Sequence, residues 1–290
     1  MSHSFNTITQ RHSTYPAIDP LLPQHSTKGK TVLITAGATG VGKSVARAFA
    51  ISGARRIFVA LRNREAHREA CKQLQDEFPG VVFEVVQVSL DSLSSIETLW
   101  QTLKDTIDIV VLSAAHSPHR GPSTTIDAHD ATAAMTTNIV GNWEMARHYL
   151  ASCQRNGVRG SIVEVSSGAA HSTNGRNSVY GASKIGSSFL LAALASENRA
   201  HLRLFSLHPG MVWSTMGEKA GYRRTDLPVD DDDLVGSFVV WLVSGEKTWL
   251  EGRFVWATWD VDELTNRKDE LLADETLLTL GLIGWAGPSK

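Results

Sequence analysis

Residues 31–49 read TVLITAGATGVGKSVARAF, and this stretch determines how the chain folds. The β-branched run at 31–35 predicts a buried strand, the small residues after it predict a tight turn, and the segment from Val45 has the pattern of a helix. A glycine-rich turn between a strand and a helix presents backbone N–H groups at the helix N-terminus, where a phosphate group binds favourably. The stretch therefore predicts a nucleotide-binding α/β unit.

The turn admits two phosphate-binding interpretations. Residues 37–44 match G-x-x-x-x-G-K-S, the P-loop of nucleotide hydrolases, whereas residues 35–42 match a T-x-x-x-x-G-x-G dinucleotide turn. A P-loop hydrolase also needs a carboxylate at the tip of an apolar strand to organise Mg²⁺, and Asp91 is the only fair candidate. The dinucleotide interpretation is favoured, and a P-loop hydrolase is kept as an alternative.

Strand and helix patterns continue to alternate along the chain. Apolar runs predict further strands at 56–61, 81–88, 107–113, 161–166, 202–210 and 252–257, with helices near 64–77, 92–104, 130–152, 179–196 and 261–273 and after the aspartates at 230–233. Continuous apolar strands between amphipathic helices are typical of a mainly parallel sheet covered on both faces.

This pattern predicts the domain organisation. We expect a single doubly wound, Rossmann-type α/β domain over residues 29–260, with helices on both faces of its sheet and a substrate lid near 213–229. An N-terminal arm at 1–28 precedes it, and a C-terminal helical extension at 261–290 follows it.

Composition excludes several functional classes. The 28 basic and 30 acidic side chains give a net charge of −2, which does not suit nucleic acid or an anionic membrane as a partner. Cys71 and Cys153 form no metal-binding motif, so neither a disulfide framework nor a metal site is expected. No apolar run is long enough to span a membrane, and the first 28 residues lack the apolar core of a secretory signal. We expect a cytoplasmic protein, with a weak mitochondrial transit peptide as an alternative.

Four side chains form a candidate catalytic set. Tyr180 and Lys184 are four residues apart on a helical segment, so they project from one face, and an ammonium group near a phenol favours the phenolate. Such a phenol can exchange a proton with a substrate oxygen. Ser167 lies thirteen residues before Tyr180, just past a strand, where its hydroxyl can reach the same oxygen. Asn138 lies mid-helix, which asparagine disfavours, so its amide has either a specific partner or a bland packing role.

Together these residues resemble the short-chain dehydrogenase/reductase family, over about residues 29–255. The resemblance implies an oxidoreductase that interconverts a ketone and a secondary alcohol. It implies that Tyr180 is the acid/base, that Lys184 holds the nicotinamide ribose and tunes Tyr180, that Ser167 orients the substrate and that Asn138 supports a proton relay. It also implies a homodimer or homotetramer formed through the helices near 130–152 and 179–196. A non-redox, isomerase-like or binding-only relative on the same fold is an alternative.

The match to the family includes departures. Ala36 replaces the first glycine of T-G-x-x-x-G-x-G, and residues 112–115 read LSAA where the family has N-N-A-G. Ser89 stands where an aspartate often contacts adenine, and Ser214 replaces the threonine of P-G-x-x-x-T. The resemblance places the cofactor at Gly37, Thr39, Gly40, Val41, Gly42, Leu61, Arg62, Ser89, Leu90, Ala114, Ala115, Tyr180, Lys184, Pro209, Gly210, Val212 and Ser214.

The end of the second strand indicates which dinucleotide is bound. An NAD(H) site would place an acid there for the ribose diol, but this chain has Leu61 followed by Arg62. We therefore expect NADP(H) to be preferred, although Arg62 and Arg64 could also be part of a solvated loop.

Aromatic and apolar residues mark the expected substrate lid. Trp213, Met216 and Tyr222 follow the HPG segment, which favours an apolar, ring-containing substrate. The tail WDVDELTNRKDELL and the arm segment YPAIDP resemble short-chain dehydrogenases of fungal secondary metabolism, which implies a polyketide or terpenoid-like substrate.

Overall fold

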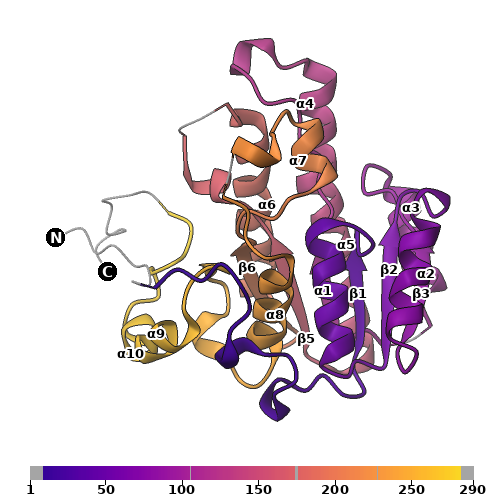
Figure 1. Ribbon diagram of the computed structural model, residues 1–290, viewed down its shortest axis with the longest axis vertical. Helices are drawn as coiled ribbons and strands as arrows, with labels where there is room; N and C mark the ends of the chain where they lie inside the picture. Colours follow the sequence, from indigo (N-terminus) through magenta and orange to yellow (C-terminus); the bar gives the residue numbers. More distant parts are fainter. Residues whose placement is uncertain (1–8, 105, 174–175, 227, 282–290) are drawn as a thin grey trace.

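In the computed structural model, residues 9–104, 106–173, 176–226 and 228–281 are described, and they form an α/β domain around one sheet (Figure 1). Within these ranges seven strands lie in the order β3-β2-β1-β4-β5-β6-β7, and every neighbouring pair is parallel. The strands are β1 (Thr31–Thr35), β2 (Arg56–Leu61), β3 (Val82–Gln87), β4 (Ile109–Leu112), β5 (Gly160–Val165), β6 (Leu202–His208) and β7 (Phe254–Trp256). This order and direction confirm the expected doubly wound fold.

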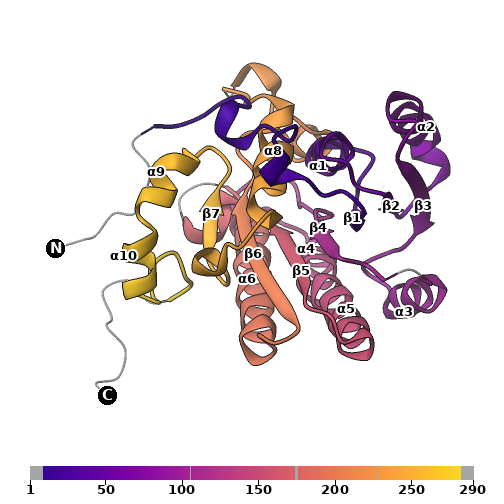
Figure 2. The ribbon, with the colours of Figure 1, turned by 90° about the horizontal axis from the view of Figure 1, so that it is seen from below.

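Helices cover both faces of the sheet. The helices are α1 (Gly40–Ile51), α2 (Arg68–Glu77), α3 (Leu93–Thr102), α4 (Ala128–Met135), α5 (Asn142–Asn156), α6 (Ser178–Glu197), α7 (Thr215–Lys219), α8 (Asp232–Val243), α9 (Val261–Asn266) and α10 (Lys268–Ala273). Figure 2 shows α1 and α8 on one face and α3, α5 and α6 on the other. Strand β1 alternates accordingly, since Val32 and Ile34 pack with the α1 and α8 side chains while Leu33 packs on the opposite side.

Close packing of α1 against α8 determines the surroundings of Ser44. The Ser44 hydroxyl accepts a hydrogen bond from the Gly236 N–H at 3.1 Å, and a Cβ on Gly236 would lie 2.5 Å from the Ser44 carbonyl oxygen. The Ser44 side chain is therefore buried between two helices, where it cannot coordinate the Mg²⁺ of a bound nucleotide. This geometry argues against the P-loop interpretation.

The helix predicted near 130–152 is confirmed, with one feature that was not predicted. The helical backbone runs from α4 to α5 without a break, and between them it contains a π-helical turn at Thr136–Gly141. Asn138 lies within this turn, and its side chain hydrogen-bonds to the backbone of His116, on a different part of the chain. A single π-helical turn inside a helix is a common feature of functional sites.

The N-terminal arm packs against the C-terminal part of the domain. Arg11 forms an ion pair with Asp260, and the Tyr15 hydroxyl accepts a hydrogen bond from the Val261 N–H at 2.8 Å. The Ile18 side chain is fully buried beside α8 and α9. No helix in the described ranges has the length and apolarity needed to cross a membrane. The same residues contain no group of three or more His, Cys, Asp or Glu that could hold a metal ion.

Candidate active site

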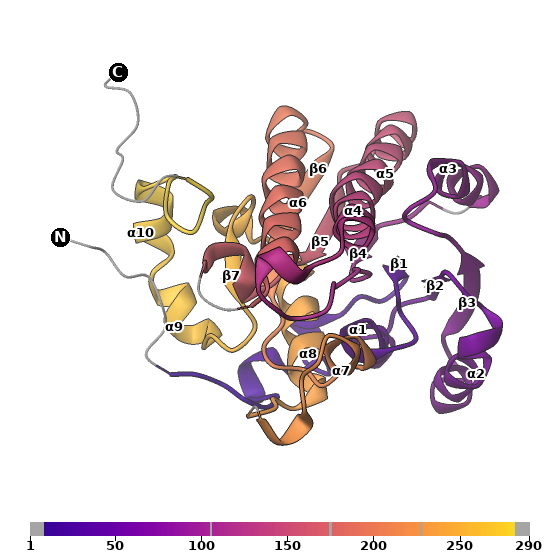
Figure 3. The ribbon, with the colours of Figure 1, turned by 90° about the horizontal axis from the view of Figure 1, so that it is seen from above.

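The predicted site residues lie at the carboxyl ends of the parallel strands. The segments that follow β1, β2, β4, β5 and β6 all meet at this edge of the sheet, which is where doubly wound folds bind their ligands. Figures 1 and 3 show α4 and α7 beyond the same edge, above the start of α6. The fold therefore brings together residues that are more than 100 positions apart in the sequence.

Lys184 is buried at the centre of this region. Its ammonium group donates a hydrogen bond to the Val165 carbonyl oxygen, at the end of β5, over 2.7 Å. Burial lowers the pKa of Lys184, and the negative charge of Glu164 opposes this shift. Among the described residues Val165 is its one hydrogen-bond acceptor, so the remaining ammonium protons can bind other acceptors.

Tyr180 lies one helical turn before Lys184, and the ammonium nitrogen is 5.9 Å from the centre of the phenol ring. Burial raises the pKa of Tyr180 well above its ordinary value, Tyr222 and Glu164 raise it further, and a hydrogen bond with Ser167 lowers it. The tuning of Tyr180 by Lys184 stays a prediction. In the chain alone, the net shift of this pKa favours the protonated phenol.

Ser167 begins the 3₁₀ turn Gly168–His171 after β5. Its hydroxyl accepts a hydrogen bond from the Ala169 N–H at 3.2 Å, and it also hydrogen-bonds to Tyr180. The next residue, Gly168, donates its N–H to His208 Nδ1 at 3.1 Å. Because His208 ends β6, this bond fixes the Ser167 turn to the neighbouring strand.

Asn138 connects the loop after β4 with α6. Its Nδ2 donates to the His116 carbonyl oxygen and to the Ser183 hydroxyl, both at 2.8 Å, and its Oδ1 accepts from the His116 N–H at 2.7 Å. The side chain is fully buried and joins three segments. A specific role for its amide was one of the two interpretations of the sequence, and these contacts supply one.

The glycine turn after β1 has the shape that a dinucleotide requires. A Cβ on Gly42 would collide with the Ala36 carbonyl oxygen, and Gly40 has φ +46°, so the backbone can approach a ligand closely at the start of α1. Ala36 adopts φ 55°, a left-handed conformation that costs an L-residue about 1–2 kcal/mol. The Thr35 hydroxyl accepts the N–H groups of Ser113 and Ala114, each at 2.9 Å, and ties β1 to the loop after β4.

The remaining cofactor candidates differ in exposure. The side chain of Leu61 is buried in the core and Leu90 is also buried, so both could contact a ligand only through their backbone. Arg62 is exposed at the end of β2. The Ser89 hydroxyl donates to Asp91 at 2.5 Å. The residues Gly37, Thr39, Val41 and Ala115 line the same edge of the sheet, in the turn after β1 and the loop after β4.

The segment after β6 leads into the residues that the sequence predicts to form a lid. Ser214 caps α7 by accepting the Gly217 N–H, and a Cβ on Gly40 would lie 3.3 Å from the Ser214 Cβ, so the residues that follow Pro209 come next to the glycine turn. Gly210 has φ +85°, and the Asp230 carboxylate lies against it and accepts the Met211 N–H at 2.6 Å. Val212 and Trp213, in the same segment, are half-buried.

The predicted lid residues are placed differently from one another. The Tyr222 hydroxyl accepts a hydrogen bond from Asn177 at 2.6 Å, one residue before α6, which brings this phenol toward Tyr180. Arg120 stacks over the Tyr222 ring, 4.8 Å from its centre. Met216, on α7, is 39% exposed.

Sequence reasoning missed His208, Asn177 and His116. His208 was quoted only as part of the HPG motif, and its hydrogen bond to the Ser167 turn depends on strand pairing across the sheet. His116 contacts Asn138 through its backbone, which leaves no side-chain signal in the sequence.

The arrangement fits a nicotinamide dinucleotide. The start of α1 offers backbone N–H groups without Cβ obstruction at Gly40 and Gly42, as a pyrophosphate requires. Lys184 offers ammonium protons beside Tyr180, and Ala114 and Ala115 leave room along the loop after β4. The residues present therefore suit the cofactor that the fold implies.

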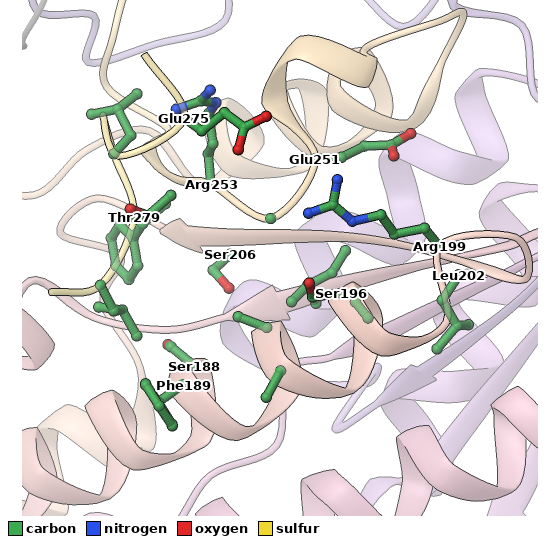
Figure 4. Close-up of a pocket in the computed structure, with 18 of the residues that line it drawn as sticks. Ser188, Phe189, Ser196, Arg199, Leu202, Ser206, Glu251, Arg253, Glu275 and Thr279 are labelled. Carbon is green, nitrogen blue, oxygen red and sulfur yellow. The ribbon is translucent and has the colours of Figure 1, made fainter. Parts of the chain in front are cut away.

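A separate cavity of about 470 Å³ lies between α6, β6 and the C-terminal segment, and none of the four candidate catalytic residues lines it. Figure 4 shows Ser188 and Phe189 from α6 and Ser206 from β6 on its wall, opposite Arg253. The cavity is therefore distinct from the site at the strand ends.

We expect His208 to make the fold pH-sensitive. Burial lowers its pKa to about 4, below the ordinary value of 6.5, so between these values the unfolded chain binds a proton that the folded chain does not. Stability should therefore fall as the pH decreases from 6.5 to 4, by on the order of 2 kcal/mol from this group after allowing for partial solvent exposure, and level off below. Urea unfolding at several pH values measures it, and His208→Asn, which keeps an acceptor for Gly168, should flatten that part of the profile. Equal slopes in both proteins would contradict the assignment.

Comparison with known proteins agrees with this geometry. The family model described as short chain dehydrogenase matches residues 30–224. A short chain dehydrogenase/reductase of Claviceps purpurea is 34% identical over 280 residues, covering 96% of this chain and 94% of its own length. The short chain dehydrogenase/reductase nsrO of Aspergillus novofumigatus is 33% identical, covering 88% and 89%.

Solved structures share the fold at low sequence identity. Pseudomonas aeruginosa RhlG, solved as an active-site complex with NADP, gives a TM-score of 0.73 at 20% identity, covering 81% of this chain and 97% of its own. Levodione reductase gives 0.71 at 19%, covering 79% and 96%. The family match and the curated relatives confirm the resemblance inferred from the sequence, and the chain belongs to the short-chain dehydrogenase/reductase family.

Proposed function

We propose that this oxidoreductase interconverts a ketone and a secondary alcohol with NADP(H), on an apolar, ring-containing substrate. The observation that carries the proposal is the grouping of Ser167, Tyr180 and Lys184 at the carboxyl end of β5, beside the glycine turn. We assign catalysis to residues 29–260, with 213–229 as the lid.

The proton chemistry follows from Tyr180. A bound nicotinamide supplies or accepts the hydride. Tyr180 holds its proton in the chain alone, so it can donate it to a ketone oxygen, with a general acid contribution of about 10² to 10⁴ in rate. The Ser167 hydroxyl, hydrogen-bonded to Tyr180, can donate to the same oxygen and fix its position. In the oxidation direction Tyr180 has to release its proton first, and positive charge nearby favours that release.

Lys184 and Asn138 would support this chemistry without exchanging the proton themselves. Lys184 would hold the nicotinamide ribose with the ammonium protons that Val165 does not accept. Asn138 forms hydrogen bonds with His116 and Ser183. These bonds hold the loop after β4 against α6 and so keep this loop and the helix in one relative position.

Preference for NADP(H) is proposed from the end of β2. The residues at this position are Leu61 and the exposed Arg62, and neither is an acid that could bind the ribose diol of NAD(H). A guanidinium group pairs well with a phosphate, such as the 2′-phosphate that distinguishes NADP(H).

The substrate class is proposed from the lid. Tyr222 acts on Tyr180, and Trp213 and Met216 add apolar and aromatic surface in the same segment after β6, which suits a polyketide or terpenoid-like ring system. Relatives from the fungi Claviceps and Aspergillus support a role in secondary metabolism. Two buried, unpaired cysteines and a near-neutral charge are consistent with the cytoplasmic location that we propose.

Tyr180→Phe tests the reaction. We expect turnover of cyclic ketones to fall at least 100-fold, because the proton donor is removed, while the NADPH dissociation constant measured by fluorescence changes less than twofold. Tyr222→Phe is the matched control and should retain measurable turnover. If Tyr180→Phe were as active as the unchanged protein, a non-redox or binding-only function would be favoured instead.

Arg62→Ala tests the cofactor preference. Removing the guanidinium should weaken NADPH binding about 10-fold or more, as expected for a charged contact to phosphate, and leave NADH binding nearly unchanged. Arg64→Ala, two residues away on the same exposed loop, is the control. If Arg62→Ala weakened the binding of NADPH and NADH equally, Arg62 would not be the residue that recognises the 2′-phosphate.

We also propose a homodimer formed through α5, the turn before it, and α6. Val140, Ile185 and Phe189 are 39%, 41% and 64% exposed on this side of the domain, and burying them between subunits would be favourable. Phe189→Glu should halve the molar mass measured by light scattering, whereas Leu21→Glu, which changes an exposed leucine in the arm, should not. A monomeric unchanged protein would contradict the proposal.

A further inference from the structure

A glutamate is fully buried on β5, the strand that leads to the candidate active site. Glu164 is in β5, and its side chain is on the same face as Ile162 and Ser166, because side chains alternate along a strand. Ser166 hydrogen-bonds to Ser188 of α6 across this face. The Glu164 carboxyl group therefore lies on the side of the sheet that α5 and α6 cover.

The Glu164 carboxyl group is fully buried and only partly hydrogen-bonded. Its Oε2 accepts the Ser206 hydroxyl at 2.7 Å, from the paired position on β6, while its Oε1 has no hydrogen-bond partner. An unpaired carboxylate in a protein interior is strongly unfavourable, so a buried one is expected to have a compensating charge nearby.

Two further buried oxygens, on the helices that cover this face of the sheet, also lack hydrogen-bond partners. Ser187 Oγ of α6 and Asn142 Oδ1 of α5 are both buried without a hydrogen bond, and Ser187 is three residues after Lys184 on the same helix. Packing alone would favour apolar side chains at these positions. The polar character of this region therefore calls for a functional explanation.

Lys184 carries a positive charge that interacts electrostatically with Glu164, without a direct ion pair between the two side chains. Its ammonium group is also fully buried and donates to the carbonyl of Val165, the residue next to Glu164. We propose that Glu164 is the buried counter-ion of Lys184, a positioning residue that keeps the ammonium group charged and held at the end of β5. The inference rests on the proposed function, because Lys184 acts there beside Tyr180.

The charge on Glu164 shifts the pKa values of Lys184 and Tyr180 in the same direction. It raises the pKa of Lys184, against the effect of burial, and it also raises the pKa of Tyr180. Removing this charge should therefore lower both values. Glu164 would then set the pH range over which Lys184 is charged while Tyr180 can exchange its proton.

Few other titratable groups act on this pair. Tyr222, from the lid, contributes to the raised pKa of Tyr180, and among the described residues Glu164 is the charged group that acts on Lys184. His208 of β6 has a pKa lowered to about 4 by burial, so it is neutral near pH 7. The pH dependence above pH 6 is therefore attributed to Lys184 and Tyr180.

Glu164→Gln tests the proposal, because the amide keeps the shape of the side chain and can still accept the Ser206 hydroxyl. For alcohol oxidation, both the acidic and the alkaline limb of the kcat/KM profile should move to lower pH by about one unit or more. A purely structural role would reduce kcat/KM at every pH and leave both limbs in place, and this result would overturn the proposal. Glu164→Met, which also lacks the charge, should move the limbs in the same direction if Glu164→Gln folds poorly.

The matched control is Glu144→Gln. Glu144 is also largely buried, but it pairs with Arg147 on the surface of α5 and does not act on Lys184. Its replacement should leave both limbs where they are in the unchanged protein. If both limbs of the profile moved as far in Glu144→Gln as in Glu164→Gln, the specific role of Glu164 would be overturned.

A second measurement separates this proposal from the proposed function. In cofactor-free protein labelled with ¹³C at lysine Cε, the Lys184 signal, assigned by its loss in Lys184→Arg, reports the protonation of Lys184 directly. In Glu164→Gln its midpoint should fall by about one unit or more. This shift would support the counter-ion role even if no ketone were reduced, whereas an unchanged midpoint would overturn it even in an active enzyme.

Discussion

The hydrogen bond from the Lys184 ammonium group to the Val165 carbonyl is the contact on which the site depends. It fixes α6 to the carboxyl end of β5. Tyr180 lies one turn before Lys184 on this helix, and Ser167 lies two residues after the strand, so the position of both side chains depends on this contact. Burying an ammonium group costs several kcal/mol unless nearby groups compensate. The proposed counter-ion Glu164, on the face of the sheet that α6 covers, would supply part of this compensation.

The protonation states of the site make it asymmetric between the two directions of reaction. Burial and the neighbouring Tyr222 and Glu164 keep the phenol of Tyr180 protonated in the chain alone. In the reaction that we propose, delivery of a proton to a ketone would need no prior change in the enzyme, whereas removal of a proton from an alcohol would need one. The protein supplies the position of the phenol, and the charge that shifts its equilibrium has to arrive with the ligand.

Most of the fold was predictable from local patterns, but parts of the site were not. The bounds of β1 and β2 agree with the apolar runs at 31–35 and 56–61, because buried parallel strands have a strong local signature. The π-helical turn around Asn138 was not predicted. It occurs together with hydrogen bonds to the backbone of His116, which is distant in the sequence, so a local pattern does not reveal it. Glu164 stood in the predicted strand SIVEVS without being recognised, because burial of a single polar residue becomes visible only when the opposing helices are in place.

The Asp230 carboxylate links the N-terminal arm to the segment after β6. It accepts the Met211 N–H at the start of the lid segment and contacts His12 of the N-terminal arm at 2.5 Å. The arm lies outside the segment that the family model matches, which begins at residue 30. A change in the arm can therefore reach the segment after β6 through this one carboxylate, although the two are nearly 200 residues apart in the sequence.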